Sequence, residues 1–110
     1  MTSVQVLYWQ EIPSVVDARE GRDTHKVQLS QRFQELIDLV AMRKGLGGTD
    51  AYLEQWAKGP SQTREGDPRA VAQAVASEIE AQYETIRSAQ MAAIRSERVK
   101  TGPGDPPGSG

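Results

Sequence analysis

The sequence predicts an α+β fold: a small antiparallel sheet of two or three strands followed by three helices, the last of them long. Alternating apolar residues, the pattern of half-buried strands, are confined to residues 3–29. From residue 33 onward, apolar residues recur every three or four positions, as in amphipathic helices. Strands that precede helices along the chain indicate α+β and not α/β. With 110 residues, the chain is expected to form a single domain over residues 1–100.

The first predicted strand covers residues 3–9. Because its second half is almost continuously apolar, we expect it to be covered on both sides and central in the sheet. Ile12-Pro13 ends it, since proline has no N–H to give to a strand ladder. A weaker strand over residues 14–19 and a third over residues 24–29 are separated by the turn residues 20–23.

Two helices are predicted next. Ser30 has the position of an N-cap whose hydroxyl accepts from the first-turn amides. The apolar stripe of the first helix consists of Phe33, Leu36, Ile37, Val40 and Ala41. Glycines in residues 45–48 end this helix. A short helix capped by Thr49 or Asp50 is predicted to run through Lys58.

The last helix has the clearest start in the chain. After a polar loop over residues 59–66, Asp67 is a predicted N-cap and Pro68 the first helical residue. The helix is predicted to run to about Val99. Its apolar stripe comprises Val71, Val75, Ile79, Tyr83, Ile86 and Ile94.

The distal part of this helix, Tyr83–Ile94, is longer than a three-stranded sheet can cover. Two arrangements follow: it contacts a partner helix or another copy of the chain, the latter giving a homo-oligomer, or it packs back along the first helix. Residues 101–110 are rich in Gly and Pro and contain almost no apolar side chains. They are predicted to form a disordered tail.

Composition excludes several classes of function. Without cysteine, the chain has no disulfide, thiol nucleophile or thiolate metal site. One histidine gives no recognisable metal-ligand spacing, so neither a metal nor a cofactor is expected. Thirteen Lys and Arg against fifteen Asp and Glu give a net charge of −2, unlike the basic surface of nucleic-acid binders. No apolar run approaches the ~20 residues of a membrane span, and no signal peptide is visible. We therefore expect a cytoplasmic protein that binds neither nucleic acid nor membrane.

The aromatic side chains are the first candidates for a binding surface. Core packing is the ordinary role of tryptophan, and Trp56 is expected to fix the short helix against the sheet. Trp9, beside Tyr8, alternates to the strand face opposite Val4. If the helices cover only one face of the sheet, Leu7 and Trp9 form an exposed apolar patch typical of partner binding.

A polar face of the first helix is the second candidate. Arg32, Glu35 and Arg43 lie on or beside it, and the spacing of Arg32 and Glu35 allows an ion pair. This face either is simply solvated or binds a partner or an anionic ligand through Arg32 and Arg43.

His25 is the only candidate for a general base. That role needs a neighbouring carboxylate and a pocket. The alternative interpretation is a partly exposed residue near the sheet edge, because one histidine defines no catalytic constellation.

Four separated blocks of the sequence carry a resemblance to a known family. They are Val6–Pro13 (VLYWQEIP), Leu29–Asp38 (LSQRFQELID), Ala41–Arg43 (AMR) and Gly48–Trp56 (GTDAYLEQW). Together they resemble the small bacterial proteins of the virulence factor domain family, and part of the domain is similar to a segment of larger proteins called conserved virulence factor C. The resemblance implies no known catalytic residues. It suggests an association with bacterial one-carbon metabolism that uses methyltetrahydrofolate and corrinoids.

Two functions follow. The first is a non-enzymatic interaction or accessory module that binds a protein partner through the sheet face around Trp9 and the polar helix face. The second is a small-molecule binder or a cofactor-light enzyme, with a pocket between sheet and helices that uses His25. The absence of a catalytic constellation in the sequence favours the first.

Overall fold

The computed structural model describes the backbone of residues 1–101 and the side chains of residues 1–96. Its elements are β1 (Thr2–Trp9), β2 (Ile12–Glu20), β3 (Asp23–Gln28), α1 (Gln31–Arg43), α2 (Asp50–Glu54), β4 (Trp56–Lys58), β5 (Gln62–Arg64), α3 (Pro68–Glu80) and α4 (Tyr83–Thr101). Apart from Thr101, the last residue of α4, the predicted tail lies outside the described residues.

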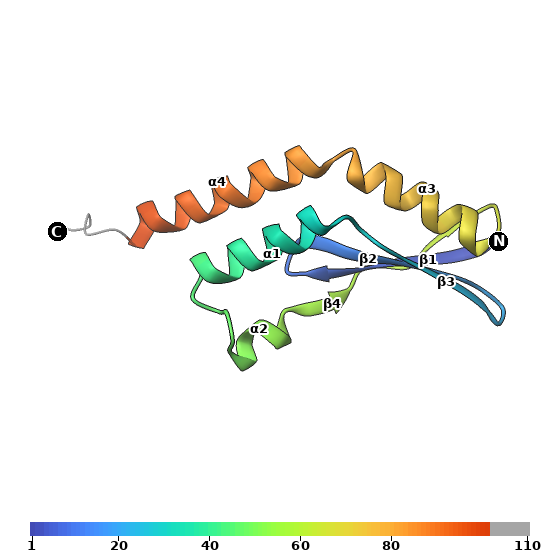
Figure 1. Ribbon diagram of the computed structural model, residues 1–110, viewed down its shortest axis with the longest axis horizontal. Helices are drawn as coiled ribbons and strands as arrows, with labels where there is room; N and C mark the ends of the chain where they lie inside the picture. Colours follow the sequence, from blue (N-terminus) through green and yellow to red (C-terminus); the bar gives the residue numbers. More distant parts are fainter. Residues whose placement is uncertain (102–110) are drawn as a thin grey trace.

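The strands form one antiparallel sheet with β1 at its centre (Figure 1). β2 pairs with one edge of β1, and β3 pairs with β2. On the other edge of β1, β4 pairs with Leu7–Trp9 and β5 pairs with Thr2–Val4. The central position predicted for the first strand is therefore confirmed, and so is the strand predicted over residues 14–19.

The prediction of a two- or three-stranded sheet followed by three helices is wrong, because residues 56–64 return to the sheet. α2 ends at Glu54, and the residues predicted as its last turn and a polar loop form β4 and β5. Between these strands, the Gly59 N–H donates to the Val6 carbonyl oxygen at 2.8 Å, so contact with β1 continues across the gap. The fold is α+β, with five strands and four helices in the described part of the chain.

The core lies between the sheet and three of the helices. α3 packs across β1, β2 and β3, α1 packs against β2, and α4 packs along α1 (Figure 1). The fully buried large side chains are Trp9, Phe33, Ile12, Leu36, Ile37, Val16 and Val40. Every apolar residue of the stripe predicted for the first helix is buried.

The long helix predicted after Pro68 is interrupted. α3 ends at Glu80, and the Gln82 N–H bonds to the Ile79 carbonyl oxygen at 2.9 Å, one residue short of the helical spacing. The chain changes direction there, so α3 follows the sheet while α4 follows α1 (Figure 1). No helix in the described part of the chain is both long enough and apolar enough to cross a bilayer.

The distal stripe of α4 packs on α1. The rings of Phe33 and Tyr83 meet edge to face with centroids 5.1 Å apart, and Ile94 is only 6% exposed. Of the two arrangements open from the sequence, packing back along the first helix is the one observed.

Helix capping agrees with the sequence at α3 and differs at α1. The Asp67 carboxylate accepts from the Ala70 N–H at 2.8 Å, and Pro68 is the first helical residue. Ser30 is the N-cap of α1, but its hydroxyl makes no capping bond. It donates instead to Glu80 Oε1 at 2.8 Å, which ties the start of α1 to the end of α3.

Candidate functional site

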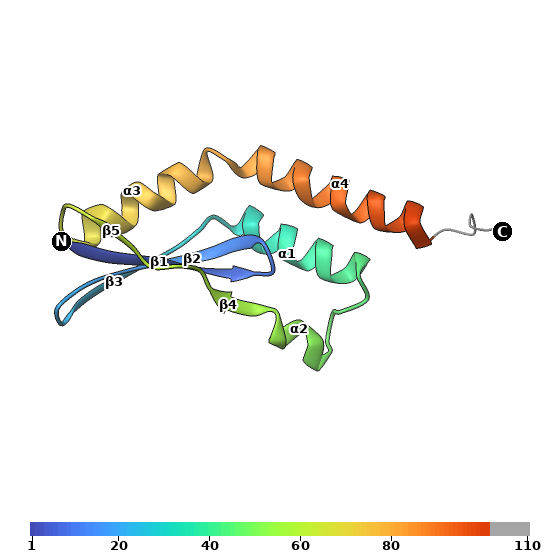
Figure 2. The same ribbon diagram turned by 180° about the vertical axis from the view of Figure 1, so that it is seen from behind.

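Among the described residues, no helix lies over one face of β1–β3, except where α2 contacts Trp9 at the end of β1. Figures 1 and 2 show α1, α3 and α4 all on the opposite side. The strand register aligns Gln5, Asp17 and Lys26 in one row across this face, and Leu7, Val15 and Lys58 in the next. These six residues surround a small cavity of about 60 Å³ and are called the open face below.

Asp17 is the most unusual residue of the open face. Although no helix covers it, it is only 8% exposed. Its Oδ2 lies 3.2 Å from Arg19 Nη2 and 3.8 Å from Lys58 Nζ. Its Oδ1 is buried and has no hydrogen-bond partner in the described part of the chain. A buried acceptor without a partner costs on the order of 1–3 kcal/mol. Water does not reach this oxygen in the structure, so a bound donor satisfies it once the exposed side chain of Arg19 or Lys58 moves aside.

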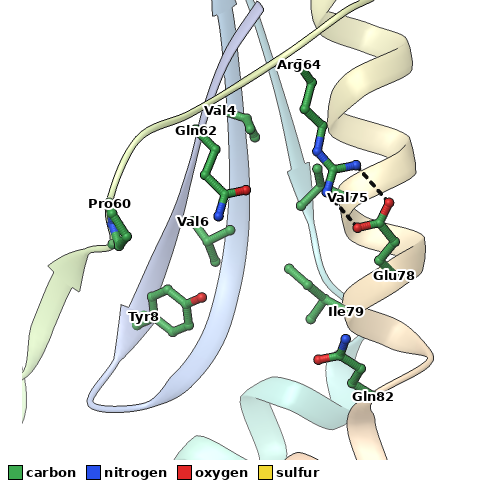
Figure 3. Close-up of a pocket in the computed structure, with 11 residues that line it drawn as sticks. Val4, Val6, Tyr8, Pro60, Gln62, Arg64, Val75, Glu78, Ile79 and Gln82 are labelled. Atoms are coloured by element: carbon green, nitrogen blue, oxygen red, sulfur yellow. Dashed lines mark hydrogen bonds and ion pairs between the residues drawn. The ribbon is translucent and has the colours of Figure 1, made fainter.

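A larger cavity of about 250 Å³ lies on the other face, between the sheet and α3 (Figure 3). We call it the α3 cavity. Its apolar lining comes from Val4 and Val6 of β1 and from Val75 and Ile79 of α3.

Polar groups stand around this apolar lining. Tyr8, Gln62 and Gln82 contribute a hydroxyl and two amides, and none of these side chains hydrogen-bonds to another described residue. Figure 3 shows the Tyr8 hydroxyl pointing across the cavity toward α3. The cavity therefore combines an apolar lining with unused hydrogen-bonding groups, which is the composition of small-molecule sites.

An ion pair closes one side of the α3 cavity. Arg64 of β5 donates from Nη1 and Nη2 to the two carboxylate oxygens of Glu78 at 2.8 and 2.7 Å (Figure 3). These hydrogen bonds lower the pKa of the Glu78 carboxyl and raise the pKa of the Arg64 guanidinium. Both side chains remain solvent-accessible, with 36% of Arg64 and 53% of Glu78 exposed.

The structure places the three aromatic candidates in three different environments. Trp9 is fully buried, so the predicted exposed patch of Leu7 and Trp9 is wrong. The reason is α2: the Trp9 Nε1–H donates to the Tyr52 carbonyl oxygen at 2.9 Å, and the two rings lie 5.4 Å apart. Trp56 is half-buried in β4, not in a helix, and pairs with Trp9. Tyr8 lines the α3 cavity.

The polar residues of α1 are also separated. Arg32 pairs with Glu80 of α3 at 3.0 Å, and not with Glu35 as the spacing predicted. Glu35 is exposed on the helix surface. Arg43 lies in the last turn, beside a shallow hollow that Met91, Ile94 and Arg95 also line. The two arginines thus stand at opposite ends of α1 and do not form one anion site.

His25 lies on the edge strand β3, half-buried, and its backbone pairs with Ala18. It lines neither the open face nor the α3 cavity, and its imidazole hydrogen-bonds to none of the described residues. In the described part of the chain, no three His, Asp or Glu side chains gather closely enough to hold a metal ion.

Comparison with known proteins gives a match to a protein family. The family model described as "Virulence factor" matches residues 7–92, from the second half of β1 into α4. The chain belongs to the virulence factor family. This confirms the resemblance carried by the four sequence blocks. A search of curated proteins and a search of solved structures each found no match. The matched residues include most of those that form the open face and most of those that line the α3 cavity. Because the family description names no reaction or ligand, its function is argued from these two sites.

Apart from Leu7 and Tyr8, sequence reasoning did not single out the residues that form the two sites as binding residues. For Asp17 a signal was available, because strand alternation places it between Val16 and Ala18 and therefore on the face opposite theirs. Arg64 and Gln62 had no comparable signal, since they lie in a segment that reads as a polar loop.

Proposed function

We propose that this protein is a non-enzymatic interaction module of the virulence factor family and that it docks a protein partner on the open face. The observation that carries the proposal is the buried Asp17 Oδ1 of the open face, which has no hydrogen-bond partner among the described residues. A partner that places a donor there satisfies this oxygen and covers the half-buried Leu7 and Val15. We therefore expect an accessory protein that acts through contacts with a protein partner. The cytoplasmic location of this protein stays a prediction.

The charged side chains around the open face indicate which kind of partner surface it binds. Arg19, Lys26 and Lys58 stand around the single carboxylate of Asp17, so the surroundings of the open face are net positive although the chain is net negative. Electrostatic complementarity favours an acidic partner surface. The expected partner segment therefore presents an apolar side chain to Leu7 and Val15, with acidic residues beside it and one donor for Asp17. Enzymes of folate and corrinoid one-carbon metabolism, which the family resemblance suggests, are where we would first look for it.

Site-specific photo-cross-linking in the native organism tests this proposal. A photoreactive amino acid replaces Leu7 on the open face, and in a matched chain it replaces Leu53, an apolar residue of α2 that is 65% exposed. We expect one discrete protein adduct from position 7 and none of the same mass from position 53. The adduct should disappear in a Lys26→Glu/Lys58→Glu background, and Arg22→Glu, a charge reversal in the β2–β3 turn, should leave it unchanged.

Three results contradict the proposal. Adducts from position 53 alone would move the docking surface to α2. An adduct that nuclease digestion removes would make the partner a nucleic acid. The lack of any adduct at either position would show that the open face docks no protein in the cell.

The rival function, a pocket enzyme with His25 as its base, has less support. The α3 cavity has the position that this hypothesis requires, between sheet and helices, but His25 does not line it. The carboxylate that does line it, Glu78, is held by Arg64.

A further inference from the structure

We infer that the α3 cavity is a binding site for a small carboxylate with an apolar body, and that Glu78 occupies the carboxylate position when no ligand is bound. This site is on the opposite side of the sheet from the open face and does not depend on the proposed docking function.

Arg64 supplies the recognition group. Its guanidinium is the only cationic group lining the cavity among the described residues. It presents two parallel N–H donors, which is the geometry that binds carboxylates in bidentate fashion. The side chain belongs to β5, whose pairing with Thr2–Val4 of β1 fixes its backbone beside the cavity.

Glu78 already shows how a carboxylate binds there. Its two oxygens accept from Arg64 at 2.8 and 2.7 Å, as those of a ligand would. Glu78 is more than half exposed on the surface of α3, so its side chain can turn into water without breaking a buried contact. An exposed ion pair of this kind contributes little to the stability of the fold. It is therefore a weak internal competitor that a ligand with additional contacts can replace.

The rest of the cavity supplies those contacts. Val4, Val6, Val75 and Ile79 form an apolar surface that suits a ring or a branched chain. The unused Tyr8 hydroxyl and Gln82 amide stand near the end of the cavity away from Arg64 (Figure 3). The volume of about 250 Å³ is below the ~300–1,000 Å³ typical of sites for drug-sized ligands. The ligand is accordingly a small acid and not a dinucleotide or another large cofactor.

Binding of phenylacetate, compared with the neutral 2-phenylacetamide, tests this inference. Titration of the ¹⁵N-labelled full chain by NMR gives both the affinity and the location of the ligand. We expect phenylacetate to shift amide signals of β1, β5 and α3 and to bind more tightly than the amide. Arg64→Gln should weaken phenylacetate binding by about tenfold, the equivalent of losing a charge-assisted hydrogen bond. The two ligands should then bind alike.

Glu78→Gln gives the decisive result. If Glu78 competes for Arg64, removing its charge should tighten phenylacetate binding, whereas loss of a structural group would weaken it. Glu84→Gln, an exposed substitution on α4, is the matched control and should change nothing. The inference is overturned if phenylacetate and the amide bind equally to the wild type, if the shifts lie outside the cavity, or if neither wild type nor Glu78→Gln binds at millimolar ligand. Failure here leaves the cross-linking test of the open face untouched.

Discussion

Arg32 and Glu80 fasten the first turn of α1 to the end of α3. Arg32 Nη2 donates to Glu80 Oε1 at 3.0 Å and to the Glu80 carbonyl oxygen at 2.8 Å, and its guanidinium lies 4.4 Å from the centre of the Tyr83 ring. The same carboxylate accepts from the Ser30 N–H at 2.6 Å and from the Ser30 hydroxyl at 2.8 Å. The Glu80 side chain therefore holds the β3–α1 junction against the end of α3, next to the bend that leads into α4.

Replacing this carboxylate should destabilise the fold. We expect Glu80→Gln to lower the free energy of unfolding by about 1 kcal/mol, because charge-assisted hydrogen bonds are lost at a site that solvent partly screens. Glu35→Gln changes an exposed glutamate of α1 and should have almost no effect. Urea unfolding followed by circular dichroism measures both. Equal effects of the two substitutions would show that Glu80 has no special role.

The same carboxylate should make stability depend on pH. Burial alone would raise the pKa of the Glu80 carboxyl, but hydrogen bonds from Ser30 and Arg32 outweigh burial and lower the pKa below its ordinary value of 4.5. A carboxyl with a lowered folded pKa stabilises the fold fully above 4.5 and loses this contribution as the pH falls through 4.5 and below. The stability difference between wild type and Glu80→Gln should therefore be constant near neutral pH and shrink in acid. A difference that grew in acid would contradict this assignment.

Trp9 should be the more sensitive of the two tryptophans. Trp9→Phe removes the Nε1–H that donates to the Tyr52 carbonyl oxygen and leaves a small void, which together should cost about 2 kcal/mol. Trp56→Phe is the same chemical change at a half-buried residue whose indole N–H donates to no described residue, and it should cost less. Thermal unfolding of the two variants compares them directly. A larger loss for Trp56 would mean that the contact of α2 with β1 does not depend on Trp9.

Gly59 should not tolerate a side chain. A Cβ at this position would lie 2.8 Å from Tyr8 Cε1 and 3.5 Å from the Val6 carbonyl oxygen. The Tyr8 ring would have to move, so Gly59→Ala should destabilise the fold by about 1–3 kcal/mol and alter the α3 cavity. Gly47→Ala meets no atom within 4 Å and serves as the control. Differential scanning calorimetry should show a lower Tm for Gly59→Ala only.

Packing of α4 on α1 predicts a contrast between two large apolar residues. Ile94 is 6% exposed and Met42 is 72% exposed. Ile94→Ala should cost about 2 kcal/mol through lost burial and a residual cavity, whereas Met42→Ala should be nearly neutral. Urea unfolding distinguishes the two. A neutral Ile94→Ala would indicate that α4 does not stay on α1 in solution.

The elements that the sequence predicted well are those with local signals. The strands on either side of the turn residues 20–23 alternate, and the stripe of α1 is complete, so both were recognised. Asp67-Pro68 marked the start of α3 because capping is a local interaction. These signals concern residues that are neighbours along the chain.

What the sequence did not predict depends on distant contacts. β4 and β5 have three residues each, too few for a pattern, and they exist because β1 offers a free edge. The bend at Ala81–Gln82 has neither Gly nor Pro and follows from the different surfaces on which α3 and α4 pack. Arg32 had a suitable partner nearby in Glu35, and only tertiary structure places Glu80 closer. Strand alternation placed Leu7 and Trp9 on one face, but the burial of Trp9 by α2 was not predicted.

β1 is the first strand to be synthesised, but the strands that pair with its second edge come much later in the chain. β2 and β3 are available to pair with β1 and with each other once residue 28 has been synthesised, but the other edge of β1 is closed by residues 56–64. Contacts between residues far apart in sequence form more slowly than local ones. A nascent chain therefore carries β1 with one open edge until residue 64 has left the ribosome, and an open edge is a template for pairing with other chains. The interval between the emergence of residue 28 and that of residue 64 from the ribosome is thus one in which β1 is exposed to pairing with other chains.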